Sequence, residues 1–252
     1  MSWVDTHCHL FLGEASPADR LDEAARREVS WVMCPGVDLE SSLEARRIAG
    51  AHPDRVRWSA GLHPHDAEAW PEVEGRIAAL AAEADAVGEC GLDYYRNLSP
   101  PEAQRHAFTA QLRLAADLGK PVIIHCRDAF ADVHNALESA ALGGNAVLHC
   151  WTGGPRWTRR FADLGVTFSF AGPVAFPTGD TVRLGAAVAP PDRTMVETDT
   201  PYLTPPPHRG EENRPALVPL VGAALAEVWG MTLSEVAAAT TATAERIFGG
   251  AP

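Results

Sequence analysis

Short apolar runs alternate along the whole chain with longer stretches of helical pattern, and this alternation limits the possible folds more than any other feature. Strand-like apolar runs occupy residues 3–10, 31–37, 56–62, 86–92, 122–126, 146–150, 166–170 and 194–197. Ala, Leu and Ile recur at helical spacing, with charges opposite, in residues 18–30, 41–51, 71–84, 102–119, 129–141, 155–165, 216–229 and 234–248. Near-continuous apolar strands that alternate with helices predict a parallel sheet covered by helices.

Eight such units most economically close into a (β/α)8 TIM barrel, and 252 residues suit one barrel. The competing fold is an open doubly wound sheet, in which ligands gather at a single switch point. Polar strings follow six of the predicted strands, which are too many for one switch point but share one mouth in a barrel. We therefore predict a single α/β barrel domain over residues 1–252, with its active site at the C-terminal mouth of the strands.

Six residues of metal-ligating type stand at the predicted strand ends: His7, His9, Glu89, His125, His149 and Asp199. His7 and His9 are two residues apart, so both imidazoles should emerge on one face of the strand. Glu89 ends an apolar strand, where an unpaired charge is costly and calls for a cation. Asp199 follows the last strand, which closes against the first, and should therefore lie near His7 and His9.

These positions predict two half-sites that together hold two divalent ions. His7, His9 and Asp199 form one, His125 and His149 form the other, and Glu89 is placed to bridge them. Imidazole and carboxylate ligands suit Zn²⁺ or Mn²⁺ and also admit Mg²⁺. Two such ions activate a shared water for in-line displacement, and Asp199 is the natural general base. The alternative is that these groups merely satisfy one another at the barrel rim.

Further predictions concern other residues near the same mouth. His63 could contact a substrate phosphate, or it could support or cap a neighbour. Arg127 shares the face of His125 and could pair with a phosphate oxygen, or it could form a surface salt bridge. Glu197 is expected to contact a ligating His rather than a metal. Aromatic side chains at the mouth either stack on bases or pack in loops; they are Tyr94, Tyr95 and Trp151.

The composition restricts the cellular context and the partners. Five cysteines without framework spacing suit reduced thiols, and those beside the ligands, such as Cys8, should point away from the metals and be buried. Apolar strand residues begin at Trp3, which leaves no room for a signal peptide, and no apolar run is long enough to span a membrane. We expect a cytoplasmic monomer. The net charge is −12, and the sequence has no cluster of basic residues. We therefore expect any contact with DNA to be confined to the end of a DNA strand.

The ordered strings DTHCHL, GLHPH, GECGLDYYR, HCRDA, HCWTGG, ETDTPYLTPPPHRG and TTATAERIFG together resemble the TatD family of metal-dependent deoxyribonucleases, within the amidohydrolase-like barrels. The resemblance covers essentially the whole chain. It implies that the same six residues are the metal ligands, and that the substrate is DNA, often cut from the 3′ end of single strands. Some relatives act on aminoacyl-tRNA esters. Glu89 stands where phosphotriesterase-type barrels carry a carboxylated Lys, which favours the TatD side.

The chain departs from the family pattern at Trp151, Pro177, Arg214 and Thr243. Pro177 replaces a common Lys and removes a possible phosphate contact. We predict a 3′-5′ exonuclease that prefers single-stranded DNA. The alternative is the same centre acting on small phosphoesters, lactones or aminoacyl-tRNA esters. A metal-stabilised scaffold is disfavoured, because structural metal sites are usually closed and mononuclear.

Overall fold

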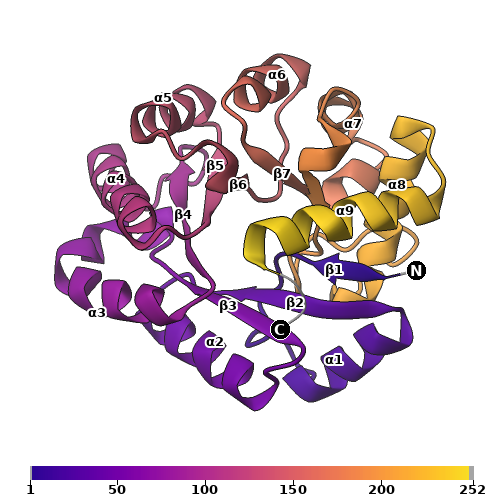
Figure 1. Ribbon diagram of the computed structural model, residues 1–252, viewed down its shortest axis with the longest axis horizontal. Helices are drawn as coiled ribbons and strands as arrows, with labels where there is room; N and C mark the ends of the chain where they lie inside the picture. The colour runs from indigo at the N-terminus through magenta and orange to yellow at the C-terminus, as the bar shows by residue number, and fades with distance from the viewer. Residues whose placement is uncertain (1, 250–252) are drawn as a thin grey trace.

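The computed structural model describes residues 2–249 and contains one eight-stranded parallel sheet in the order β1 to β8 (Figure 1). Its strands are β1 (Trp3–Asp5), β2 (Val29–Pro35), β3 (Val56–Ala60), β4 (Ala86–Asp93), β5 (Val122–Arg127), β6 (Ala146–Leu148), β7 (Thr167–Phe170) and β8 (Thr194–Val196). Each strand pairs with the next in the chain, so the predicted (β/α)8 barrel is confirmed. The expected single unit of residues 1–252 stays a prediction, since residues 1 and 250–252 lie outside the described part.

Helices surround the sheet, as Figure 1 shows. They are α1 (Pro17–Arg26), α2 (Leu39–Ala51), α3 (Trp70–Glu83), α4 (Pro101–Leu118), α5 (Phe130–Ala140), α6 (Pro155–Asp163), α7 (Asp180–Ala186), α8 (Val218–Trp229) and α9 (Leu233–Phe248). Local signals set their ends. Asp38 and Ser41 form a capping box at the start of α2, and α4 ends at Gly119, whose φ of 64° is left-handed.

The barrel closes where β8 meets β1. The amide of Thr6 donates to the carbonyl of Val196 at 3.1 Å, and the amide of Asp199 donates to the carbonyl of His7 at 2.9 Å. An isolated parallel bridge joins Cys8 to Thr200 just beyond the strands. These contacts bring the segment after β8 directly beside the segment after β1.

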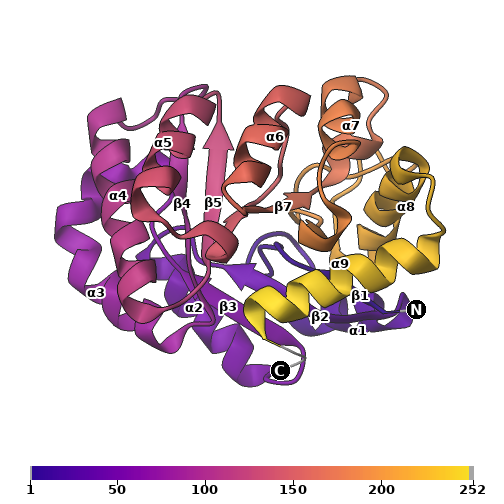
Figure 2. The same cartoon turned by 45° about the horizontal axis from the view of Figure 1, so that its top comes forward.

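The two ends of the barrel differ. An inward-facing apolar cluster includes Trp31 and Met33 of β2 and is capped by Ala244 and Phe248 of α9. In Figure 2 the β5 arrow points away from α9. The apolar end of the barrel is therefore sealed by α9, and the polar residues occupy the opposite end, where the strands finish.

Some element boundaries differ from the prediction. β1 ends at Asp5 rather than at residue 10, because the chain beyond it bonds to the segment after β8. The first helix ends at Arg26, and β2 already begins at Val29. β6 ends at Leu148, and Cys150 adopts a left-handed φ of 43°. α7 and several short 3-10 turns were not predicted, because their apolar spacing is too short to show a period.

Within residues 2–249, no single helix combines the length and hydropathy needed to cross a membrane. The adjoining segments Pro215–Trp229 and Leu233–Phe248 meet those criteria only as a pair, and the pair is bent by 111°.

Candidate metal centre

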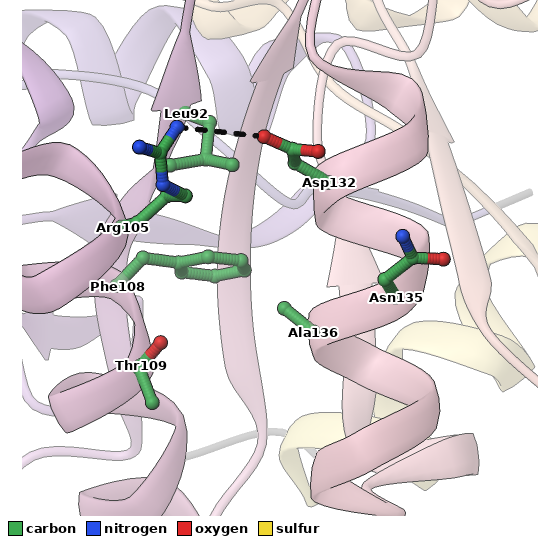
Figure 3. Close-up of a pocket in the computed structure, with 7 residues that line it drawn as sticks. All are labelled: Leu92, Arg105, Phe108, Thr109, Asp132, Asn135 and Ala136. Atoms are coloured by element: carbon green, nitrogen blue, oxygen red, sulfur yellow. Dashed lines mark ion pairs between the residues drawn. The ribbon is translucent and has the colours of Figure 1, made fainter. Parts of the chain in front are cut away.

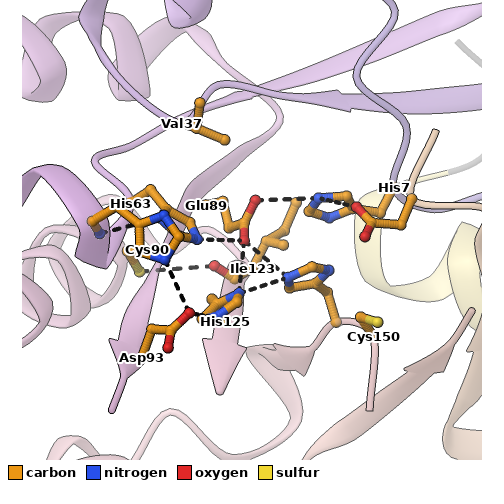
Figure 4. Close-up of polar contacts among 12 residues, drawn as sticks. His7, Val37, His63, Glu89, Cys90, Asp93, Ile123, His125 and Cys150 are labelled. Carbon is orange, nitrogen blue, oxygen red and sulfur yellow. Dashed lines mark hydrogen bonds and ion pairs between the residues drawn. The ribbon is translucent and has the colours of Figure 1, made fainter. Parts of the chain in front are cut away.

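Glu89 lies at the centre of a cluster of imidazoles, and its two carboxylate oxygens point in different directions (Figure 4). It stands near the middle of β4 and not at the strand end as predicted, because β4 continues to Asp93. Oε2 lies 3.2 Å from Nε2 of His7. Oε1 lies 2.9 Å from Nε2 of His149, 3.2 Å from Nδ1 of His125 and 3.4 Å from Nε2 of His63. One carboxylate therefore faces imidazoles on two sides. The two sides are in contact, because the rings of His7 and His149 stack with their centroids 3.9 Å apart.

Asp199 completes the group on the His7 side. Its Oδ1 lies 3.5 Å from Nε2 of His9 and 3.9 Å from Nε2 of His7. The left-handed φ of 59° at Asp199 and its backbone hydrogen bond to His7 turn the chain after β8 toward the segment after β1. His7, His9 and Asp199 therefore lie together, as the sequence predicts.

The structure brings one further imidazole among the candidate ligands. Donor atoms of His63, Glu89 and His125 all lie within 4.8 Å of one another. The sequence predicts for His63 a phosphate contact or a supporting role. Its Nδ1 accepts a hydrogen bond from the amide of His65 at 3.2 Å, which leaves Nε2 directed at Glu89. His63 thus has the position of a ligand as well as that of a mouth residue.

Two further carboxylates contact imidazoles of the cluster through the ring nitrogens that do not face Glu89. Oδ2 of Asp93 lies 3.1 Å from Nε2 of His125, and Oε1 of Glu197 lies 3.3 Å from Nδ1 of His149. Such contacts fix the ring orientation and leave the opposite nitrogen for the centre. The contact of Glu197 with a histidine is the one predicted. The role of Asp93 was missed, although its place four residues after Glu89 on one strand puts both on one face.

Asp5, also missed, joins the two ligand-bearing segments at the barrel seam. Its Oδ1 accepts from the amides of Thr198 at 2.9 Å and His7 at 3.3 Å, and its Oδ2 accepts from the Thr198 hydroxyl at 2.6 Å. Burial raises the pKa of Asp5 to about 8. The spacing of two residues from His7 was the available signal. This carboxyl clamps the segment that carries His7 to the one that carries Asp199.

The electrostatics of the cluster favour an ionised Glu89 beside positive charge. Burial alone would raise the pKa of Glu89, but His149, His63 and His7 outweigh it and hold the pKa well below its usual range. Burial lowers the pKa of His63 to about 4. Burial also opposes a charge on His149, yet Glu89 and Glu197 raise its pKa well above the ordinary value. Glu89 is therefore an ionised carboxylate, and the imidazoles around it offset its charge.

His7 provides the test of whether a metal ion fits. Both of its ring nitrogens are buried without a hydrogen-bond partner, although Nε2 lies close to Oε2 of Glu89. Buried polar atoms are nearly always hydrogen-bonded, and a cation held by Nε2 of His7 and Oε2 of Glu89 would give this nitrogen a partner. Imidazole and carboxylate donors are those preferred by Zn²⁺ and Mn²⁺. The residues present fit a metal centre.

Known proteins match this chain over nearly its full length. A family model described as TatD related DNase matches residues 4–249. The chain belongs to the TatD family. The uncharacterized metal-dependent hydrolase YcfH of Escherichia coli (strain K12) is 38% identical over 256 residues, covering 98% of this chain and 96% of YcfH. The 3′-5′ ssDNA/RNA exonuclease TatD of Citrobacter rodentium (strain ICC168) is 40% identical over 232 residues, covering 88% of this chain and 87% of that protein.

A solved structure supports the same assignment. The TatD homologue YjjV from Escherichia coli K12 superimposes with a TM-score of 0.91 at 27% identity, covering 98% of this chain and 97% of YjjV. The predicted family resemblance is confirmed. As a member of the TatD family, the protein is a metal-dependent hydrolase, and its His, Glu and Asp cluster is the group that could bind the metal.

The departures from the TatD pattern have structural contacts of their own. Nε of Arg214 donates to Glu23 of α1 at 2.8 Å. Trp151 is buried, and its indole N–H donates to Thr158 at 2.8 Å, so it packs in the core rather than at the mouth. The hydroxyl of Thr243 donates to the carbonyl of Ala239 within α9. Pro177 is exposed after β7, where its carbonyl accepts from Arg183.

Tyr94 faces away from the TatD metal cluster. A hollow of about 320 Å³ lies between α4 and α5 on the outside of the barrel, with Arg105 and Asp132 at its rim and Phe108 below (Figure 3). The hydroxyl of Tyr94 donates to Asp132 at 2.6 Å. Loop packing, rather than base stacking, is therefore the correct interpretation of Tyr94.

The thiols follow strand alternation with one exception. All five cysteines are free, and Cys8, Cys90 and Cys126 are buried in the core as predicted. Cys150 is only partly buried, because its left-handed backbone breaks the alternation.

The side chains of Cys8 and His9 are expected to face opposite sides of the chain, and metal analysis can test this. His9→Ala should lower the metal content of the purified protein, and Cys8→Ala should leave it unchanged in elemental analysis. Equal losses in both variants would contradict this facing.

Proposed function

We propose that this protein hydrolyses phosphodiester bonds in DNA as a 3′-5′ exonuclease that prefers single-stranded ends. We further propose that two divalent cations assist, held by His7, His9, Glu89, His125, His149 and Asp199, with His63 available on the His125 side. The exonuclease name of a relative that is 40% identical supports the substrate class.

One observation carries the proposal of two ions. The oxygens of Glu89 face different donor groups, Oε2 toward His7 and Oε1 toward His149, His125 and His63. A carboxylate in this position is suited to bridging two cations. Paired cations lower the pKa of an attacking water and neutralise charge on the attacking and leaving oxygens of a phosphodiester.

The chain itself supplies the proton acceptor. Burial would raise the pKa of Asp199, but His9 and His7 lower it, so the carboxylate is ionised and able to take a proton. The side chain of Asp199 is 14% exposed, against 4% for Glu89, so Asp199 is the more accessible of the two from the mouth. We assign Asp199 as the general base and Glu89 as the residue that holds the centre together.

The acidic net charge of the chain supports contact with the ends of DNA strands rather than binding along a long DNA duplex. The net charge is −12, and a protein that grips duplex non-specifically normally has a basic patch. Arg127, exposed at the end of β5 two residues after His125, is the proposed phosphate contact of the chain. The same charge also favours the alternative, a hydrolase of small phosphoesters, lactones or aminoacyl esters built on the same centre.

The experiment compares the two substrate classes directly. Purified protein with Mg²⁺, Mn²⁺ or Zn²⁺ is incubated with end-labelled single- and double-stranded DNA and, in parallel, with small esters. We expect stepwise shortening of the single strand from its 3′ end, and a loss of about 10²- to 10⁴-fold in Asp199→Asn, because a general base contributes that much. Turnover of esters with intact DNA would overturn the proposal.

A further inference from the structure

Two exposed tyrosines flank the mouth of the barrel. Of the Phe, Trp and Tyr residues within residues 2–249, the exposed ones are Tyr95 at 62% and Tyr202 at 55%. Tyr95 follows β4 and Tyr202 follows β8, and strands four apart in a closed eight-stranded sheet stand on opposite sides of the barrel. The candidate metal centre therefore lies between the two segments that carry these exposed tyrosines.

Tyr202 is anchored to the Asp199 side of the centre. Its amide donates to the carbonyl of Asp199 at 2.8 Å, and its own carbonyl accepts from Nδ2 of the buried Asn213 at 2.6 Å. Its ring centroid lies 6.4 Å from that of His9, at an interplanar angle of 67°. The backbone on both sides of the ring is therefore held, while the ring itself stays open to solvent.

Tyr95 is anchored to the His125 side. Its amide donates at 3.0 Å to Oδ1 of Asp93, whose Oδ2 contacts Nε2 of His125. The guanidinium carbon of Arg127 lies 4.0 Å from the centroid of the Tyr95 ring. The cation covers one face of the ring and orients it, and most of the remaining side chain is exposed. One carboxylate thus fixes both this ring and an imidazole of the centre.

We propose that Tyr95 and Tyr202 stack on bases of a single-stranded substrate, on opposite sides of the phosphodiester that is cleaved. This inference rests on the proposed function and names its binding subsites. Every base has a π face, so stacking holds any sequence, but bases paired in a duplex do not offer that face. Stacking would therefore let an acidic protein bind nucleic acid without a basic patch. It would also favour single-stranded over double-stranded substrates.

Steady-state kinetics on two labelled oligonucleotides test the inference. One is an ordinary single strand, and the other is identical but lacks the bases of its two 3′-terminal nucleotides. We expect Tyr95→Ala and Tyr202→Ala each to raise KM on the ordinary strand by about 5- to 100-fold, the usual range for one lost base stack, with kcat nearly unchanged. On the abasic strand, the variants and the wild-type protein should have similar KM values.

Controls separate stacking from damage to the site. The Phe variants of both tyrosines should retain the wild-type KM, because the ring is kept. Leu98→Ala should also leave KM unchanged, since Leu98 is 64% exposed just beyond Tyr95 but has no π face. Elemental analysis should give equal metal content in all variants.

The outcomes distinguish this inference from the proposed function. If the wild-type protein shortens DNA and the alanine variants have its KM on the ordinary strand, stacking is overturned and the exonuclease remains. If the wild-type protein leaves DNA intact, the proposed function fails, and fluorescence polarisation with the same oligonucleotides decides the stacking. Equal Kd values for the ordinary and abasic strands would then overturn it.

Discussion

Glu89→Ala is expected to abolish metal-dependent hydrolysis and to remove bound metal from the protein. Both oxygens of Glu89 lie within 3.4 Å of imidazole nitrogens, on two sides of the cluster, so the substitution takes one donor from each group. Removing one electrostatic contact to a transition state typically costs about 10²- to 10³-fold in rate, and the loss here should reach at least the upper end of that range. The measurements are kcat/KM on an end-labelled single strand and elemental analysis.

A matched substitution controls for the loss of a glutamate. Glu245 lies exposed on α9, at the sealed end of the barrel, and Glu245→Ala should keep both activity and metal content. Glu89→Gln keeps the side-chain volume but loses the charge that the imidazoles stabilise, and should resemble Glu89→Ala in metal content. Wild-type metal content in both Glu89 variants would contradict the bridging role.

Gly91→Ala is expected to destabilise the fold and to disturb the metal centre together. Gly91 has a left-handed φ of 143° and pairs in register with His125 of β5. A Cβ there would overlap the carbonyl oxygen of His125 and lie 2.9 Å from its amide nitrogen. Backbone strain and overpacking each cost about 1–3 kcal/mol, and a sum of about 3 kcal/mol lowers Tm by roughly 6–12 °C in a chain of this size.

Gly75→Ala provides the control for a glycine substitution. Gly75 lies within α3, and a Cβ there would meet no atom within 4 Å. Alanine is the better helix former, so this variant should match or exceed the wild-type stability by about 0.5–1 kcal/mol. Thermal unfolding of both variants measures the change in stability, and elemental analysis measures the change in metal content. A Gly91→Ala protein with the wild-type Tm and metal content would show that β5 moves freely, against the close approach described above.

The fold class was predictable because its signals are local. Apolar runs and helical spacing are properties of short segments, and eight repeats of the same unit have few ways to close. The order of the strands was predictable for the same reason, so His7 and Asp199 were expected beside each other, although several strands end at other residues than predicted. Errors arose where the backbone leaves its regular form, as at Cys150, whose left-handed φ of 43° no period could reveal.

The sequence by itself determined the type of barrel, the end at which its polar residues gather and the kinds of donor atom brought there. Only the tertiary structure decided how those atoms are shared. It placed His63 beside Glu89, set Asp93 behind His125, and made Asp5 the clamp between the segments after β1 and β8. The physical reason is range: periodicity assigns a residue to a face, but which side chains meet across a barrel mouth depends on strand register and loop paths that no local pattern encodes.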